Sequence, residues 1–238
     1  MSCVNCNTDF DSEFCPNCGE KRVVPRINLI SLVNHFYCSF LDMDKGFLFN
    51  LKNLTLQPRE TVLAYLSGSR RKFLNPISYT IITISIYIIL TALIKEYKST
   101  TLTEELAERI QNMSKIEEIG YNTGKIIFEQ LKFFWILMTF CLSAFTRLIF
   151  KRFNFFEHLA INFFVVGHST ILAILVKAFY HKEILIFNFL VFIYMTFLIY
   201  KIFRNKKEQA FSITMSIMSV FFAYLMFFTI PLLVILYS

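Results

Sequence analysis

The chain has 238 residues, of which 55% are hydrophobic and only 17% are charged, and its mean hydropathy is +0.53. Ordinary soluble domains carry about 25% charged residues, so this composition excludes that class and indicates an integral membrane protein. The formal net charge of +7 would suggest nucleic-acid binding in a soluble chain. In a membrane protein, however, basic residues report topology first.

The amino-terminal residues do not form a signal peptide. MSCVNCNTDFD has neither a basic start nor an apolar run of the required length, so we expect the amino terminus to stay where it is made. Residues 1–20 contain no Lys or Arg, and the first basic residue is Lys21. Phosphate contacts need such charges, so we do not expect nucleic acid as a partner.

Four cysteines near the amino terminus have the spacing of a metal site. Cys3 and Cys6 form one C-x2-C pair, Cys15 and Cys18 form a second, and eight residues separate the pairs. Two residues between thiolates let a tight turn aim both sulfurs at one ion, and two such turns complete a tetrahedral shell. Zinc is the metal we expect in a reducing compartment. A disulfide pair or an iron centre is the alternative.

The expected zinc is structural. About 20 residues cannot bury a core that would hold the segment folded, whereas zinc contributes about 10–16 kcal/mol in finger peptides. All four ligand positions are filled, and a catalytic zinc keeps one open. Pro16 presets one turn, and Gly19 and Asn7 tolerate left-handed backbone after each pair. We therefore predict a cytosolic zinc-ribbon domain over residues 1–24.

Residues 25–73 are predicted to form amphipathic juxtamembrane helices. Asn28 begins an apolar stripe with helical spacing that continues to Phe40, and a second helix starts at Pro58 and stops at Gly68. Arg70, Arg71 and Lys72 follow at once. Such helices either lie in the lipid headgroup plane or pack on the membrane bundle, and the sequence leaves both alternatives open.

Residues 74–238 are predicted to be an all-α polytopic transmembrane domain. Five apolar stretches have about the length that crosses 30 Å of hydrocarbon, at residues 77–94, 133–150, 158–179, 184–203 and 211–236. The connection at residues 95–132 has six basic and seven acidic residues, and it contains a capping box and an apolar stripe that predict an outer helix.

The basic residues favour one orientation. They gather before the first span, at the end of the second, and between the fourth and fifth, as Arg70, Arg71, Lys72, Arg147, Lys151, Arg152, Lys201, Arg204, Lys206 and Lys207. The positive-inside rule then places the amino terminus in the cytosol and the carboxyl terminus outside. Thiols stay reduced and free to bind metal on that side.

Ionisable residues at membrane depth are functional candidates by default. Glu157, His158 and His168 are the candidates for a catalytic or transport site, and the alternative is a structural role with Glu157 paired to a nearby Arg or Lys. Glu157 and His168 are eleven positions apart, so they share a helix face at a separation of about 16 Å. His158 and Asn162, at i and i+4, could share a ligand. No nucleophile elbow, Walker loop or dinucleotide fingerprint is present.

The chain resembles a known family. The CxxC...CxxCG head, the stretch DKGFLFNLKNLTLQPRETVLAYLSGSRRKFLNP before a span, and FEHLAINFFVVGH are similar to bacterial membrane proteins grouped as domain of unknown function 3667 (DUF3667). The motif positions that carry the resemblance are Asp44, Gly46, Pro58, Tyr65, Gly68, Arg70, Pro76, Glu157, His158 and His168. The resemblance implies a location in the bacterial inner membrane, and no reaction is assigned to the family.

Two functions are consistent with these residues. The first is a non-enzymatic membrane protein whose cytosolic zinc ribbon and basic juxtamembrane helices recruit a cytosolic protein or membrane lipid. The second is a membrane-embedded enzyme or transporter that uses Glu157, His158 and His168. The closed metal site and the missing catalytic motifs favour the first.

Overall fold

The computed structural model describes residues 2–3, 6–19, 28, 30, 43–70, 72–99, 133–180, 189–205 and 208–237. Within these residues the fold is all-helical and has no strand, which confirms the predicted class. An isolated antiparallel bridge joins Ser2 and Asp9. The elements are α2 (Met43–Leu56), α3 (Pro58–Ser67), α4 (Pro76–Ser99), the 3-10 helix η1 (Phe133–Ile136), α7 (Leu137–Ile149), α8 (Phe155–Tyr180), α9 (Phe189–Phe203) and α10 (Gln209–Tyr237).

Helices lie at all five predicted spans, but within the described residues only three are long and apolar enough to cross a membrane by length and composition. These three stretches are Pro76–Ile94 in α4, Phe155–Phe179 in α8 and Gln209–Thr229 in α10. The other two, α7 and α9, are shorter apolar helices. Five spans are therefore not established by helix length, and part of the predicted fourth span, residues 184–188, lies outside the described residues.

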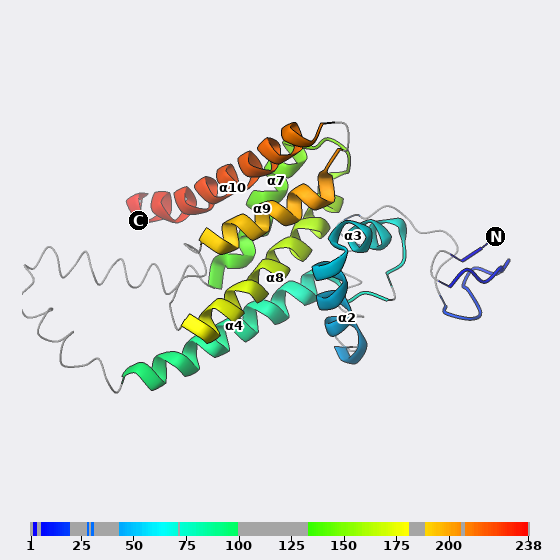
Figure 1. Cartoon of the computed structure of the whole chain (residues 1–238), viewed down its shortest axis with the longest axis horizontal. Helices are drawn as coiled ribbons and strands as arrows, with labels where there is room; N and C mark the ends of the chain where they lie inside the picture. The colour runs from blue at the N-terminus through cyan, green and yellow to red at the C-terminus, as the bar shows by residue number, and fades with distance from the viewer. Residues whose placement is uncertain are drawn as a thin grey trace, which may run out of the picture.

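Five apolar helices form the bundle, and their directions alternate. Figure 1 shows α4, α8 and α10 running one way, and α7 and α9 running the other. The α7–α8 and α9–α10 connections lie at the end of the bundle where α2 and α3 pack (Figure 1). We call this the hairpin end, because the chain turns there between α2 and α3 at the single residue Gln57.

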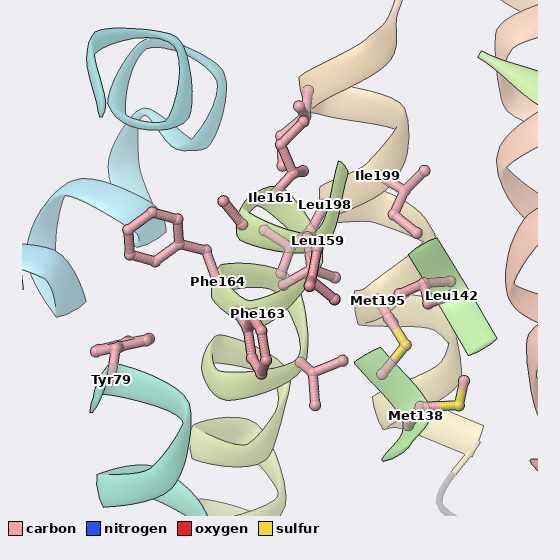
Figure 2. Close-up of a cluster of buried hydrophobic side chains, with 14 of the residues drawn as sticks. Tyr79, Met138, Leu142, Leu159, Ile161, Phe163, Phe164, Met195, Leu198 and Ile199 are labelled. Carbon is pink, nitrogen blue, oxygen red and sulfur yellow. The ribbon is translucent and has the colours of Figure 1, made fainter. Parts of the chain in front are cut away.

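The core is centred on α8, which contacts α4, α7 and α9. Figure 2 shows Met138 of α7 and Met195 of α9 on one side of α8, and Phe164 of α8 on the side that faces α2 and α3. All three side chains are buried. Because α8 has apolar neighbours on several sides, its own residues are hydrophobic around most of its circumference. This is expected for a buried helix.

A glycine permits the close approach of α4 and α8. A Cβ atom at Gly167 would lie 2.9 Å from Thr80 Oγ1 and 3.0 Å from Tyr79 Cδ1, closer than ordinary van der Waals contact. The Thr80 hydroxyl also donates to the Phe163 carbonyl across the same interface. A small residue in this span therefore serves close helix packing.

The structure confirms one juxtamembrane helix and adds another. Helix α3 has Pro58 at its start, and Gly68 ends it in the left-handed conformation with φ of 119°, as predicted. Helix α2 was not predicted as an element. The predicted helix near residues 28–40 lies outside the described residues, except for Asn28 and Ile30. Helix α4 continues to Ser99, into the predicted outer segment 95–132, and residues 100–132 lie outside the described part.

Both described juxtamembrane helices pack on the bundle. The Tyr65 ring of α3 meets Phe164 of α8 edge-on at a centroid distance of 5.3 Å. The Phe47 ring of α2 lies 5.4 Å from the Tyr79 ring of α4. Aromatic pairs at such distances contribute about 0.5–1.5 kcal/mol beyond area burial. Within the described residues, α2 and α3 therefore pack on the bundle.

Candidate metal centre and juxtamembrane contacts

The four amino-terminal cysteines converge. The sulfurs of Cys3, Cys6, Cys15 and Cys18 all lie within 4.8 Å of one another, and they form the one group of three or more His, Cys, Asp or Glu residues close enough to hold a metal in the described part of the chain. The shortest separations join the two C-x2-C pairs, at 3.5 Å between Cys3 and Cys18 and 3.6 Å between Cys6 and Cys15.

These distances fit one tetrahedral ion. Four sulfurs at about 2.3 Å from zinc stand roughly 3.8 Å apart, close to the two shortest separations. A disulfide would require about 2.05 Å, and all four cysteines are free thiols here. The donor set is therefore suited to zinc or another thiolate-seeking metal, and a bound metal would join two turns that share no core of their own.

The two cysteine turns have the same backbone geometry. The Asn7 N–H donates to the Cys3 carbonyl at 3.0 Å, and the Gly19 N–H donates to the Cys15 carbonyl at 2.7 Å. Asn7 has φ of 58° and Gly19 has φ of 65°, so both adopt the left-handed conformation that these residue types tolerate. The sequence-based expectation for both positions is confirmed.

Thr8 links the two turns, a role that the cysteine spacing did not reveal. Its Oγ1 lies 3.2 Å from Cys6 Sγ and accepts a hydrogen bond of 3.2 Å from Asn17 Nδ2 of the second turn. In the thiol form, Cys6 Sγ donates to this oxygen, and in the thiolate form the Thr8 hydroxyl donates to the sulfur instead. Hydrogen bonds from the Thr8 side chain and backbone lower the pKa of the Cys6 thiol to about 6. The thiolate is the metal ligand, so Thr8 favours the form that binds.

Asn50 attaches α2 to the turn between α3 and α4. Its Nδ2 donates to the Leu74 carbonyl at 3.0 Å, and the Leu74 N–H donates to its Oδ1 at 3.2 Å. One turn earlier on α2, a Cβ at Gly46 would lie 2.9 Å from both Leu74 N and Leu74 Cβ. Gly46 therefore allows α2 to approach Leu74 closely, and Asn50 satisfies the buried backbone groups of Leu74.

Arg59 attaches α3 to the end of α9. Its Nη1 donates to the carbonyls of Ile202 and Arg204, both at 2.9 Å. The last carbonyls of a helix have no partner within the helix, so Arg59 satisfies two groups that would otherwise need water. Tyr65, in the same helix, is buried, and that burial raises the pKa of its hydroxyl above the usual value.

His168 lies in a directed chain of hydrogen bonds. Thr55 of α2 donates to the Leu51 carbonyl at 2.7 Å, so its oxygen accepts from His168 Nε2 at 3.2 Å. The other ring nitrogen, Nδ1, then accepts from the Tyr79 hydroxyl at 2.8 Å. Both ring nitrogens are used within the protein, and the chain connects α4, α8 and α2.

His158 and Asn162 converge on one hydroxyl, as their spacing predicts. The His158 Nδ1 lies 3.1 Å from Thr146 Oγ1, and Asn162 Nδ2 donates to the same oxygen at 2.8 Å. The other ring nitrogen of His158, Nε2, donates to the Phe150 carbonyl at 3.2 Å. This cluster joins α8 to α7, and both histidine nitrogens are again occupied.

Glu157 caps α8, and within the described residues its carboxylate bonds to a backbone N–H and not to a cation. Its Oε2 accepts from the Asn154 N–H, and its own N–H donates to Asn154 Oδ1, both at 2.8 Å. This reciprocal pair is a capping box. The spacing Asn154-x-x-Glu157 in the sequence is that of a capping box. It explains why an acidic residue lies at this position better than the expected ion pair does.

The three catalytic candidates do not form one site. His158 and His168 are ten positions apart on α8, about 15 Å along the axis, and each belongs to its own hydrogen-bonded group. Their use as an enzyme or transport site stays a prediction. Sequence reasoning did not single out Lys177, which is 1% exposed near the end of α8, although a lysine inside an apolar run was a signal.

Residues 44–88 match the family model described as protein of unknown function (DUF3667). No curated protein and no solved structure matches the chain. The matched segment contains α2, α3 and the first half of α4, and therefore the Gly46, Asn50 and Arg59 contacts and the Tyr79 end of the His168 chain. Over this segment the chain is similar to the DUF3667 family, whose description assigns no activity.

Proposed function

We propose that the chain is an inner-membrane protein with five spans whose cytosolic knuckle binds zinc and recruits a protein or lipid partner. The observation that carries the proposal is the convergence of Cys3, Cys6, Cys15 and Cys18. Four thiolates close the coordination shell of zinc, whereas catalytic zinc keeps one position open. Zinc held there would stabilise a small binding surface and would not perform a reaction.

The alternating helix directions support five crossings (Figure 1). The 4 residues of η1 and the 13 of α7 make a continuous 17-residue helical stretch, which lies at the lower limit for a transmembrane helix. Lys151 and Arg152 occupy the α7–α8 connection, and Arg204 follows α9. By the positive-inside rule, the hairpin end then faces the cytosol.

The surface of α2 supports a lipid contact. Leu48 and Leu56 are exposed large apolar side chains, and Lys52 lies exposed between them on the same helix. Exposed apolar residues beside a basic residue are typical of a helix at the lipid–water interface. A helix at the hairpin end with this composition can touch headgroups while its other face packs on the bundle.

The recruitment proposal is tested by copurification from the native host. The intact chain, Cys15→Ser and Cys141→Ser are compared for bound zinc, proteins and lipids. Cys141 is a buried free thiol of α7, so it controls for loss of a cysteine outside the knuckle. We expect Cys15→Ser to lose zinc and at least one partner and Cys141→Ser to keep both. Identical partners for all three chains, and for a chain lacking residues 1–24, would refute recruitment by the knuckle.

Topology is tested separately with reporter fusions. Fusions after residues 152 and 205 should report the cytosol, and fusions after residues 115 and 184 should report the outside. A fusion in either pair on the opposite side would contradict the five-span arrangement, whatever the zinc content.

A further inference from the structure

A cleft with a volume of about 310 Å³ lies between the α2–α3 corner and the end of α9. Its lining residues are Leu56, Gln57, Pro58, Arg59, Glu60, Lys201 and Arg204. We propose that this cleft binds a phosphate-bearing anion, supplied either by an anionic phospholipid headgroup or by free phosphate. This inference rests on the proposed function and deepens its lipid part, because it assigns the headgroup contact to particular residues.

The position of Arg59 leaves donors for a ligand. Its Nη1 donates to the carbonyls of Ile202 and Arg204, and these bonds hold the guanidinium at the carboxyl end of α9. A guanidinium has five N–H donors in a planar fork, so these two contacts leave others available. Arginine held in this way is pre-organised for phosphate, which accepts two parallel hydrogen bonds.

The lining is basic on balance. Three of the lining residues are cationic, and Glu60 is the one acidic residue among them. Burial lowers the pKa of Arg59, and repulsion from Arg152 and Arg204 lowers it further, against an opposing effect from Glu60. These cations therefore repel one another at the cleft, and a bound anion would relieve that repulsion.

Helix capping alone does not account for the cluster. Cations at the end of a helix interact favourably with its dipole, and this explains Lys201 and Arg204 on their own element. It does not explain why α3 and the α7–α8 connection bring Arg59 and Arg152 to the same place. An anion bound between these elements explains why Arg59 and Arg152 lie close together. The first turn of α3 has no side-chain cap, so its backbone N–H groups add further donors.

The size and place of the cleft favour a headgroup. Ligand pockets have volumes of about 300–1,000 Å³, so this cleft is at the small end and fits a phosphate group better than a large cofactor. It lies at the hairpin end, where the apolar helices stop. Leu56 lines the cleft and is 67% exposed, so it offers an apolar contact beside the charged groups.

The test uses the full-length chain in phosphatidylcholine nanodiscs, with phosphatidylglycerol added in one arm and inorganic pyrophosphate in the other. Lys201→Gln, Arg204→Gln and the double variant remove charge at the cleft, and Lys151→Gln removes an exposed charge of the α7–α8 connection that does not line the cleft. Arg59 is left intact because it also holds α9. Ligand-dependent shifts in the thermal midpoint and lipid retention in native mass spectrometry are measured.

We expect each cleft substitution to weaken binding about fivefold and the double variant roughly 25-fold, since a basic residue near an anionic surface is worth about 1 kcal/mol. Lys151→Gln should change binding little. An effect of phosphatidylglycerol alone supports a lipid source, and an effect of pyrophosphate supports a soluble one. Equal ligand effects in all variants would overturn the site but leave recruitment by the knuckle intact. Arg204→Lys is the matched control, because it changes the same residue but keeps the positive charge. It should bind the anion better than Arg204→Gln does, which separates loss of charge from loss of folding.

Discussion

Replacing Asn50 with alanine tests whether the DUF3667 segment is held together as described. Asn50 is 0% exposed, and it satisfies both the N–H and the carbonyl of Leu74. Alanine leaves two buried backbone groups without these partners, at about 1–3 kcal/mol each. The expected loss is therefore about 2–6 kcal/mol. For a chain of this length, 1 kcal/mol shifts the midpoint by about 2–4 °C, so the midpoint should fall by at least about 4 °C.

The assay is thermal unfolding of the purified chain in detergent, followed by fluorescence-detected size exclusion. Lys52→Ala is the control, because Lys52 is exposed on the same helix and such substitutions usually change stability by less than about 0.5 kcal/mol. If Asn50→Ala unfolds at the same temperature as Lys52→Ala, α2 is not anchored through Leu74 and the described packing of the segment is wrong.

Three further substitutions probe α8. Gly167→Ala should destabilise by about 1–3 kcal/mol, because the added methyl overlaps Thr80; a more stable variant would show that α4 and α8 are not in close contact. Tyr79→Phe should cost about 1 kcal/mol through the lost bond to His168, and an unchanged midpoint would remove that bond from the account. Glu157→Ala should cost about 1 kcal/mol as a lost cap, with Glu157→Gln recovering most of it; equal losses in both would favour a role for the charge.

Local rules predicted the elements whose signals lie within a few residues. The C-x2-C turns need only Cys, Asn7 and Gly19 within one turn each, and their conformations agree with expectation. Pro58 and Gly68 mark the two ends of α3 for equally local reasons. Apolar run length located the bundle helices, of which three meet the length and composition of a membrane span within the described residues.

Contacts between residues that lie far apart in the sequence could not be predicted from it. Helix α2 contains Gly46 and has a weak apolar pattern, and it is held by Leu74 and by the bond between Thr55 and His168, 113 positions apart. The basic cleft likewise needs α3 and α9 to meet. Glu157 is different, because its capping-box spacing with Asn154 was readable, but its position near membrane depth suggested only a functional site or an ion pair.

The zinc content of the purified full-length chain tests the central claim most directly. Native mass spectrometry of the intact protein should find one zinc per chain, and Cys15→Ser should lose it, because three remaining thiolates cannot close the shell. Cys141→Ser should keep the metal. An intact chain with no bound metal, or with zinc retained after Cys15→Ser, would contradict a four-cysteine knuckle as the basis of this protein's function.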